Sequence, residues 1–485
     1  MYLLGIDLGT SALKLLLLDS DGEILEIVSE TYSLSMPYPG WAEQDPEDWW
    51  KAVRNGFATL AQSYDLSKIA ALSFSGQMHG LVALDNKGKV IRPAILWNDN
   101  RSHQEVTYLN DEIGRKKLIQ ETGNIAYAGF TLPKLLWLRK HETYNFKCIH
   151  KILLPKDYLA YRFTGHYSTD YSDASGTLLL DVKDKKWSKF VLELCGLEES
   201  VLPQLYEGYE VVGKVKPNLA EKLGLSPDCV VAAGAGDNAA AAIGSGVLED
   251  LDCNISLGTS GTIFIKNSHF ISVPNSEVHS FAHADGSYHL LGCILSAASA
   301  NKWWVEDILC SNDYDSVLQN DVKLGENSVY FMPYLMGERS PLNDEKVRGA
   351  FIGLALNTSR QEMSLAILEG VAYALKSSLD IATSLGLDVI KSKISGGGAK
   401  SEIWKIILAN VLQLEIEENE VSEAPALGAA ILAGLAAGRF SSFEEACHLL
   451  IKTKDCTKPS PALMEKYAQG YKRFSKLYPM LKGFY

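Results

Sequence analysis

Short apolar runs bounded by glycine and polar residues recur along the chain and predict β-strands. In the first half these runs are residues 2–6, 13–19, 24–29 and 69–75. The first three predict an antiparallel meander, because the Asp21-Gly22 pair between the second and third is typical of a hairpin turn. Longer stretches with helical spacing follow, among them residues 295–309 and 360–385. Strands mixed with helices over 485 residues predict an α/β protein of more than one domain.

Local signals divide this pattern further. Pro46 follows Asp45, a favourable N-cap residue, so we expect a helix to begin there. A Gly-Ser-Gly and acidic segment at residues 245–253 separates an alanine-rich helix from the strands that follow. The expected units are an N-terminal domain at residues 1–246, a C-terminal domain at 254–439 and an amphipathic helical tail at 440–485.

Two strand-turn-strand segments carry the same turn. Gly9-Thr10-Ser11 follows the first strand, and Gly258-Thr259-Ser260 follows a strand about halfway along the chain. Such a turn leaves backbone N–H groups and a hydroxyl facing open space, which suits phosphate oxygens. Two such turns, one in each half, predict that a polyphosphate is clamped between two similar domains. We therefore expect both turns, with Lys14 beside the first, to hold this polyphosphate.

Two aspartates lie near these turns. Asp7 ends the first strand, where its carboxylate could hold Mg²⁺ or position the metal's waters; the alternative is a turn-capping residue. Asp237 follows Gly234-Ala235-Gly236 and begins an alanine-rich helix, with Asn238 next to it. A helix N-terminus favours the anionic carboxylate and aims it into a cleft. We expect Asp237 to be a general base near the metal, the alternative being a simple N-cap.

Two polar segments offer hydrogen-bonding groups to a neutral polyol. Residues 76–80 place Gln77 and His79 between two glycines, although a lone histidine is more often structural. In residues 96–101, Trp97 adds an aromatic face, Asp99 an acid and Arg101 a guanidinium. We expect both segments, together with Asn238, to contact a sugar. A surface salt-bridge loop is the alternative for residues 96–101.

A glycine-rich turn precedes the helix expected at residues 403–412. Gly396-Gly397-Gly398 carries no side chains, so a flat ring or ribose can approach its backbone. We expect Gly397, Gly398 and the nearby Lys400 to contact the nucleotide. The sequence lacks a Walker-type phosphate loop and zinc-spaced His and Cys residues.

Composition restricts the partners. The net charge is −13, and no basic run suggests nucleic-acid binding. The N-terminal apolar run is broken at Asp7 and lacks a basic leader, while the eight cysteines are scattered without a C-x-x-C pair. These features predict a cytoplasmic protein with no nucleic acid and no membrane as partner. A homodimer is left open.

The order of these motifs resembles the FGGY family of carbohydrate kinases, within the actin-like ATPase group. The resemblance covers almost the whole chain, and residues 129–138 and 349–370 also fit the family's signatures. It implies two actin-like (ribonuclease H-like) domains, with ATP and sugar meeting in the cleft between them. It also implies Mg²⁺-ATP as phosphoryl donor, Asp237 as general base, and Met78 and His79 as sugar contacts.

Several segments are most similar to those family members that phosphorylate D-xylulose. These segments are residues 77–80, 154–159, 169–177, 278–281 and 337–339. One departure is Leu342 after Pro341, where those members commonly carry histidine. The resemblance implies phosphorylation of D-xylulose to D-xylulose 5-phosphate, with ribulose, gluconate or glycerol as alternative substrates. The alternative from another class is a nucleotide-gated binding protein, which would need no sugar loop.

Overall fold

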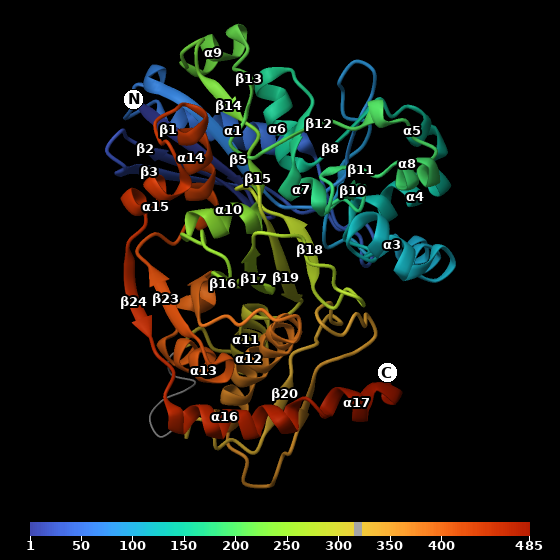
Figure 1. Ribbon diagram of the computed structural model, residues 1–485, viewed down its shortest axis with the longest axis vertical. Helices are drawn as coiled ribbons and strands as arrows, with labels where there is room; N and C mark the ends of the chain where they lie inside the picture. Colours follow the sequence, from blue (N-terminus) through green and yellow to red (C-terminus); the bar gives the residue numbers. More distant parts are fainter. Residues whose placement is uncertain (315–322) are drawn as a thin grey trace.

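The structure is a computed structural model and describes residues 1–314 and 323–485. Figure 1 shows two halves stacked along the long axis, the upper one holding the N-terminus and the lower one the C-terminus. Each half is built around a mixed β-sheet.

The first sheet has the strand order β13-β14-β5-β1-β2-β3, with β15 beside the end of β5. Its strands are β1 Tyr2–Leu8, β2 Ala12–Leu18, β3 Ile24–Thr31, β5 Ile69–Gly76, β13 Val211–Lys214, β14 Val230–Ala232 and β15 Ala235–Gly236. Strands β1, β2 and β3 form an antiparallel meander, and β1 runs parallel to β5. The predicted meander and the strand ending at Gly76 are therefore confirmed.

The second sheet repeats this topology. Its strands are β16 Cys253–Leu257, β17 Gly261–Asn267, β18 His279–Ala282, β19 Tyr288–Ile294, β22 Lys391–Ser395, β23 Glu415–Asn419 and β24 Thr453–Thr457. The run β19-β17-β16-β22-β23-β24 has the order and the parallel or antiparallel pairings of β3-β2-β1-β5-β14-β13. This repetition confirms the predicted α/β fold of two actin-like domains.

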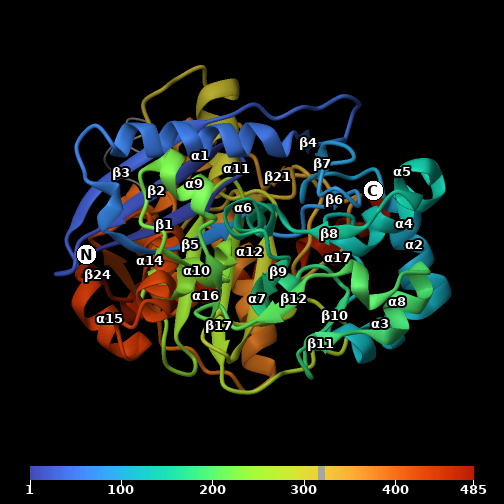
Figure 2. The same cartoon turned by 90° about the horizontal axis from the view of Figure 1, so that it is seen from above.

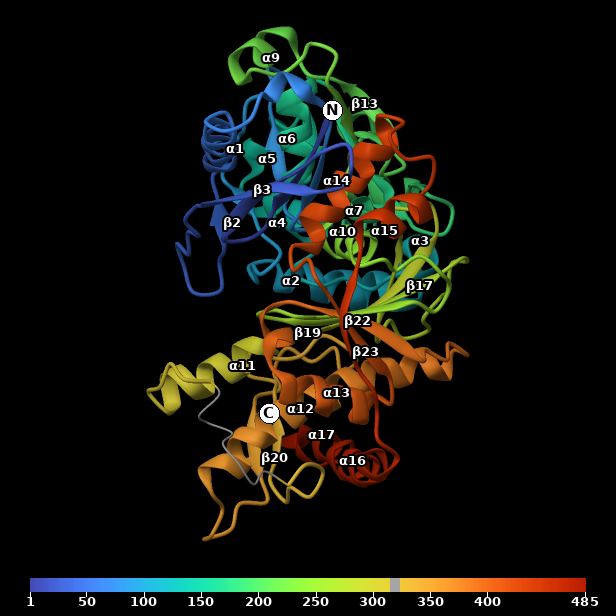
Figure 3. The ribbon, with the colours of Figure 1, turned by 90° about the vertical axis from the view of Figure 1, so that its left-hand side faces the viewer.

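Helices cover both faces of the first sheet (Figure 3). On one face lie α1 Pro46–Leu60 and α6 Pro155–Thr164, and on the other α10 Asp237–Gly244 and α14 Ala424–Ala436. The Asp45 side chain accepts a hydrogen bond from the Glu47 N–H, which confirms the expected N-cap of α1.

Helix α14 returns from the second half of the chain to pack on β1, β5 and α10. A Cβ on Gly5 of β1 would lie 1.9 Å from the Ala426 carbonyl oxygen, and one on Gly428 would lie 1.9 Å from that of Ala240. The backbones therefore approach closely because these positions carry no side chain. Helix α14 lies within the predicted unit 254–439, and its packing partners β1, β5 and α10 lie within the predicted unit 1–246.

The second half contains α12 Arg360–Ser384 and α13 Glu402–Leu412, which pack together near its sheet. Both confirm expected helices, whereas the stretch 295–309 divides into α11 Ala298–Lys302 and a π-helical turn at Trp303–Ile308. The expected helical tail is interrupted by β24, which pairs with β23. Its helices are α15 Phe443–Leu450, α16 Pro461–Phe474 and α17 Leu477–Leu481.

A large insertion between β5 and β13 forms a lobe beside the first sheet (Figure 2). Its helices are α2 His103–Thr107, α3 Arg115–Thr122, α4 Thr131–His141, α5 Thr143–Lys147, α7 Tyr171–Ser175 and α8 Lys189–Cys195. Its short strands are β6 Val82–Leu84, β7 Ala94–Ile95, β8 Lys151–Leu153, β9 Ser168–Asp170, β10 Leu180–Asp181, β11 Lys186–Trp187 and β12 Gln204–Tyr206. The remaining short elements are β4 Glu43–Gln44, α9 Pro217–Leu223, β20 Tyr330–Met332 and β21 Ala350–Ile352. The core of this lobe includes Phe264, Phe281 and Leu291, so the second half contributes to it.

Candidate active site

The carboxylate of Asp7 lies at the end of β1, beside the end of β5. Asp7 pairs with Ser75 in the parallel ladder, and the Ser75 hydroxyl donates to Asp7 Oδ1 at 2.9 Å. The Asp7 side chain is half-buried, and lost hydration raises its pKa to about 6. Asp7 is thus a carboxylate with one fixed partner and partial access to solvent.

Asp237 begins α10 immediately after β15, whose Gly236 pairs with Gly76 of β5. Its Oδ1 accepts hydrogen bonds from the Asn238 backbone N–H at 2.7 Å and from Asn238 Nδ2 at 2.8 Å. Burial, followed by the negative charge of Asp7, raises the pKa of Asp237 to about 7. The two carboxylates therefore flank the end of β5 within electrostatic range of each other.

The first Gly-Thr-Ser turn is held by a network of side chains. The Thr10 hydroxyl accepts a hydrogen bond from Trp97 Nε1 at 2.9 Å and donates to Gln77 Oε1 at 3.2 Å. The Gln44 amide accepts from Gln77 Nε2 at 3.0 Å and donates to the Thr10 carbonyl at 2.6 Å. Gln77 is therefore engaged inside the protein, and Gln44, which no sequence motif indicated, positions the turn.

The remaining candidates near this turn differ in accessibility. Ser11 is exposed, whereas the Lys14 ammonium forms an ion pair with Glu423, which immediately precedes α14. Lys14 thus has a protein carboxylate as partner, and it links β2 to a segment far away in sequence.

The second Gly-Thr-Ser turn joins β16 to β17 and is more open. Thr259 is exposed, while the carbonyls of Gly258 and Thr259 accept hydrogen bonds from Ala298 at 2.9 Å and Ala297 at 3.0 Å. Ser260 is half-buried. Three residues after Thr259, the Thr262 hydroxyl donates to Asn238 Oδ1 at 3.3 Å. This contact places the start of β17 beside the residue that follows Asp237.

The triple-glycine turn lies against this second turn. A Cβ on Gly396 would lie 2.6 Å from the Leu257 carbonyl oxygen, so the two backbones are adjacent. Gly397 is exposed, with nothing within 4 Å of its Cβ position, whereas Gly398 is buried against Leu257 and Trp404. Lys400 is exposed. Gly397 therefore offers the accessible backbone of this turn.

The segment around Met78 and His79 faces the Asp237 loop. A Cβ on Gly236 would lie 2.9 Å from Met78 Cγ. His79 has a φ of +70°, and its carbonyl accepts hydrogen bonds from Thr131 Oγ1 at 3.0 Å and Lys134 Nζ at 2.9 Å. These two donors hold the residue in an unfavourable backbone conformation.

The His79 imidazole is neutral and has a defined tautomer. Burial, with the charges of Arg339 and Lys134, holds its pKa well below the usual value. His79 Nδ1 lies 2.7 Å from the Gly176 carbonyl oxygen and must therefore carry the proton. Nε2 is consequently an acceptor.

The segment at residues 96–101 is only partly available to a ligand. The Arg101 guanidinium pairs with Asp99 at 2.7 Å and with Glu43 at 2.7 Å, and stacks 3.6 Å from the Trp41 ring centre. Asp99 and Arg101 are both buried. We expected these two residues to contact the sugar, but each belongs to an internal ion pair. This matches the salt-bridge alternative for residues 96–101, except that the pair is buried and not at the surface. Trp97 remains half-buried.

A buried charged cluster supports the Asp237 loop. Lys156 Nζ lies 2.7 Å from Asp157 Oδ1, 2.8 Å from Asp170 Oδ1 and 3.3 Å from the Ala233 carbonyl oxygen. Ser172 Oγ donates to Asp170 Oδ2 and accepts from the Gly236 N–H at 3.1 Å. We did not predict a site role for this cluster, although its charged residues lie within 154–159 and 169–177, two of the segments that resemble the family.

Two features of residues 1–314 and 323–485 bear on metals and membranes. In this part of the chain, no group of three or more His, Cys, Asp and Glu side chains could hold a metal ion. Asp7 and Asp237 could therefore bind Mg²⁺ only with phosphate oxygens or water completing its shell. Among the same residues, no helix is both long and apolar enough to cross a bilayer.

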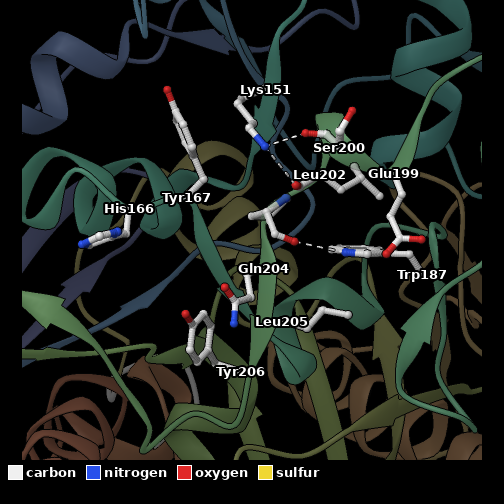
Figure 4. Close-up of a pocket in the computed structure, with 11 residues that line it drawn as sticks. Lys151, His166, Tyr167, Trp187, Glu199, Ser200, Leu202, Gln204, Leu205 and Tyr206 are labelled. Carbon is white, nitrogen blue, oxygen red and sulfur yellow. Dashed lines mark hydrogen bonds between the residues drawn. The ribbon is translucent and has the colours of Figure 1, made fainter.

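A separate hollow of about 580 Å³ lies on the insertion lobe (Figure 4). Lys151 Nζ donates to the Ser200 carbonyl at 2.5 Å, and Trp187 Nε1 donates to that of Pro203 at 3.1 Å. These donors are used within the protein. None of the predicted site residues lines this hollow.

Family models match both halves of the chain. The N-terminal domain model of the FGGY family of carbohydrate kinases matches residues 2–244, and the C-terminal domain model matches residues 253–437.

Individual relatives agree with this match. The xylulose kinase of Escherichia coli K12 is 42% identical over 449 residues, covering 92% of each chain. A crystal structure described as a "xyloylose kinase" from Brucella ovis is 39% identical, with a TM-score of 0.94 over 100% of both chains. A gluconate kinase structure from Lactobacillus acidophilus is 27% identical, with a TM-score of 0.93 over 99% of this chain and 98% of that one.

Proposed function

The chain belongs to the FGGY family of carbohydrate kinases, and from that premise we propose that it phosphorylates D-xylulose to D-xylulose 5-phosphate. Family membership makes it an ATP-dependent sugar kinase. The choice of sugar is supported by the 42% identical xylulose kinase, whereas the gluconate kinase structure is only 27% identical. Ribulose, gluconate or glycerol is the alternative substrate.

The position of Asp237 carries the proposal. Met78 of the sugar segment packs against Gly236 on one side, and Thr262 of the second hairpin bonds to Asn238 on the other. A base at this position has the expected sugar segment and the expected phosphate turn as its two neighbours.

Asp237 is proposed to accept the proton of the C5 hydroxyl. The sugar oxygen forms a bond to the γ-phosphorus, the bond to the β–γ bridging oxygen breaks, and ADP leaves. A pKa of about 7 suits a base that operates near neutral pH. Such help is typically worth ~10²–10⁴-fold, and alignment of the two substrates contributes further.

The metal and the nucleotide are assigned to the surrounding groups. Asp7, with Asp237 nearby, suits Mg²⁺, which prefers carboxylate and phosphate oxygens. When bound, Mg²⁺ would neutralise developing phosphate charge. The turns at residues 9–11 and 258–260 would hold the phosphates, and Gly397 with Lys400 would contact the nucleoside side.

The sugar is assigned to Met78, His79 and Trp97. His79 Nε2 is free to accept a hydrogen bond from a sugar hydroxyl, because Nδ1 is committed to Gly176. Closure of the units 1–246 and 254–439 about residues 245–253 would exclude water and limit wasteful ATP hydrolysis.

A panel of sugars in an ADP-release assay tests the proposal. D-xylulose should give the highest kcat/KM among D-xylulose, ribulose, gluconate and glycerol, and phosphate should appear on C5 by NMR. A higher value for another sugar would replace D-xylulose with that sugar. ATP turnover that no sugar stimulates would contradict the proposal altogether.

A further inference from the structure

A tight loop of the second half, residues 337–344, reaches the sugar side of the first half. Its ends are joined by hydrogen bonds from the Glu338 N–H to the Asp344 carbonyl at 2.8 Å and from the Asp344 N–H to the Glu338 carbonyl at 2.9 Å. Gly337 has a φ of +81°, and a Cβ there would lie 2.8 Å from the Glu345 carbonyl oxygen. The loop therefore has a defined shape.

Tyr127 of the first half anchors this loop. Its hydroxyl lies 2.7 Å from Asn343 Oδ1 and 2.9 Å from the Ser276 carbonyl oxygen, both in the second half. The Arg339 guanidinium lies 5.3 Å from the centre of the same ring. The buried Glu338 carboxylate also accepts from the Arg339 N–H at 2.8 Å, so the backbone of Arg339 is fixed.

The Arg339 guanidinium lies where the sugar-side segments meet. Its Nη2 is 3.0 Å from the point where a Cβ on Gly129 would lie, and the Trp97 carbonyl oxygen is 2.4 Å from that point. The positive charge of Arg339 contributes to the lowered pKa of His79 and of the buried His279. Arg339 is thus close to Trp97, to Gly129 and to two neutral imidazoles.

This guanidinium differs from the other arginines of the region. Arg101 pairs with Asp99 and Glu43, and Arg92 pairs with Glu43 and Glu142. Arg339 is half-buried and forms no ion pair with any residue that the structure describes. Its donors are therefore available to a ligand.

We propose that Arg339 donates hydrogen bonds to oxygen atoms of the sugar, so that the second half completes the sugar site of the first. This inference rests on the proposed function. A neutral polyol must find both acceptors and donors. His79 Nε2 supplies an acceptor, and the Arg339 guanidinium supplies donors only. A hydrogen bond from a charged group changes affinity by about ten- to a hundredfold.

The test compares Arg339→Met, Arg339→Lys and the control Arg348→Met. Arg348 is exposed, and its Nη1 donates to the carbonyls of Glu345 and Val347 at 2.8 Å. Arg348→Met is therefore the same substitution at a position outside the proposed site. Arg339→Met should raise the sugar KM by about ten- to a hundredfold. Its ATP KM should stay within about twofold of wild type, Arg339→Lys should recover part of the loss, and Arg348→Met should leave both KM values unchanged.

Deoxy analogues of the sugar identify the contact. In wild type, removal of the contacted oxygen should raise KM, and in Arg339→Met the same removal should have little further effect. An unchanged sugar KM would overturn the proposal. So would a fall in kcat with the sugar KM unchanged, or a joint rise of both KM values with a lowered melting temperature.

The result is separate from the identity of the substrate. If the sugar panel selects a sugar other than D-xylulose, the same variants are measured with that sugar. The role of Arg339 can then be tested even if the substrate is not D-xylulose.

Discussion

The first and second Gly-Thr-Ser turns have the same hairpin but different surroundings. In the first, Asp7 precedes the turn by two residues; in the second, Ser256 occupies the corresponding position. The Thr10 hydroxyl is bonded to Trp97 and Gln77, whereas Thr259 is exposed. The first turn is therefore charged and internally fixed, and the second is open.

This difference shows how a repeated motif can serve two purposes. The matching sheets place both turns at equivalent points of the two halves. Neighbouring side chains then decide what each turn offers. The first combines a carboxylate with a fixed connection through Gln77 to residues 76–80, the predicted sugar segment, and the second presents a hydroxyl beside the triple-glycine turn.

The largest expected effect comes from Asp237, which lies between the turns and belongs to neither. Asp237→Ala should lower kcat by at least ~10²-fold, because the hydroxyl loses its base. ATP binding should change little, since both turns stay intact. Single-turnover kinetics and nucleotide titration measure the two quantities, and sugar phosphorylation within tenfold of wild type would contradict the role of base.

The acidic position distinguishes the turns most directly. Asp7→Ser gives the first turn the residue of the second. It should lower kcat/KM for ATP by roughly 10²-fold, because it removes the charged group that we propose to align the phosphates. Ser256→Ala, the matched change in the second turn, should cost less than about threefold. Equal losses in steady-state assays would show that the acid does not distinguish the turns.

The two threonines should respond in different ways. Thr259→Val should raise the ATP KM by up to about tenfold with unfolding unchanged, because it removes an exposed hydroxyl. Thr10→Val should instead lower the free energy of unfolding by about 1–3 kcal/mol, since Trp97 Nε1 and Gln77 Oε1 lose their partner. Urea denaturation and ATP kinetics on both variants test this, and identical behaviour would contradict the comparison.

The smallest expected effect is on pH-dependent stability. The pKa of Asp7 is raised to about 6, so its contribution to stability is present below its ordinary value and is lost as pH rises through 6. The Asp7→Ser variant has no carboxyl at this position, so this pH-dependent loss of stability is absent from it. Relative to wild type, the variant should gain about 1 kcal/mol between pH 5 and pH 8. Urea unfolding with EDTA and without nucleotide measures the gain. A pH-independent difference would show that Asp7 is not destabilised by burial.

Much of the fold could be predicted from local patterns. The β1–β2–β3 meander, the cap at Asp45, the strand ending at Gly76 and the helix beginning at Asp237 all depend on residues a few positions apart. Such short-range signals also located both turns and both carboxylates. The roles of these residues stay predictions.

Other features depend on contacts between distant segments. Asp99 and Arg101 offer polar groups in the sequence, but in the structure they pair with each other and with Glu43. Gln44 carries no motif, yet it joins the first turn to Gln77. A sequence shows which groups can form hydrogen bonds, whereas their partners depend on which segments pack together.

The placement of α14 and of Arg339 illustrates the same limit. The alanine- and glycine-rich stretch identifies a closely packing helix, but only the fold decides that its partners are β1, β5 and α10. The shape of the loop at residues 337–344 likewise depends on local hydrogen bonds. Its contact with Tyr127 does not, because Tyr127 lies in the other half of the chain. The sequence by itself determined the elements and their chemistry. The tertiary structure decided which of them meet, because long-range packing satisfies buried polar groups and fills space for the whole chain at once.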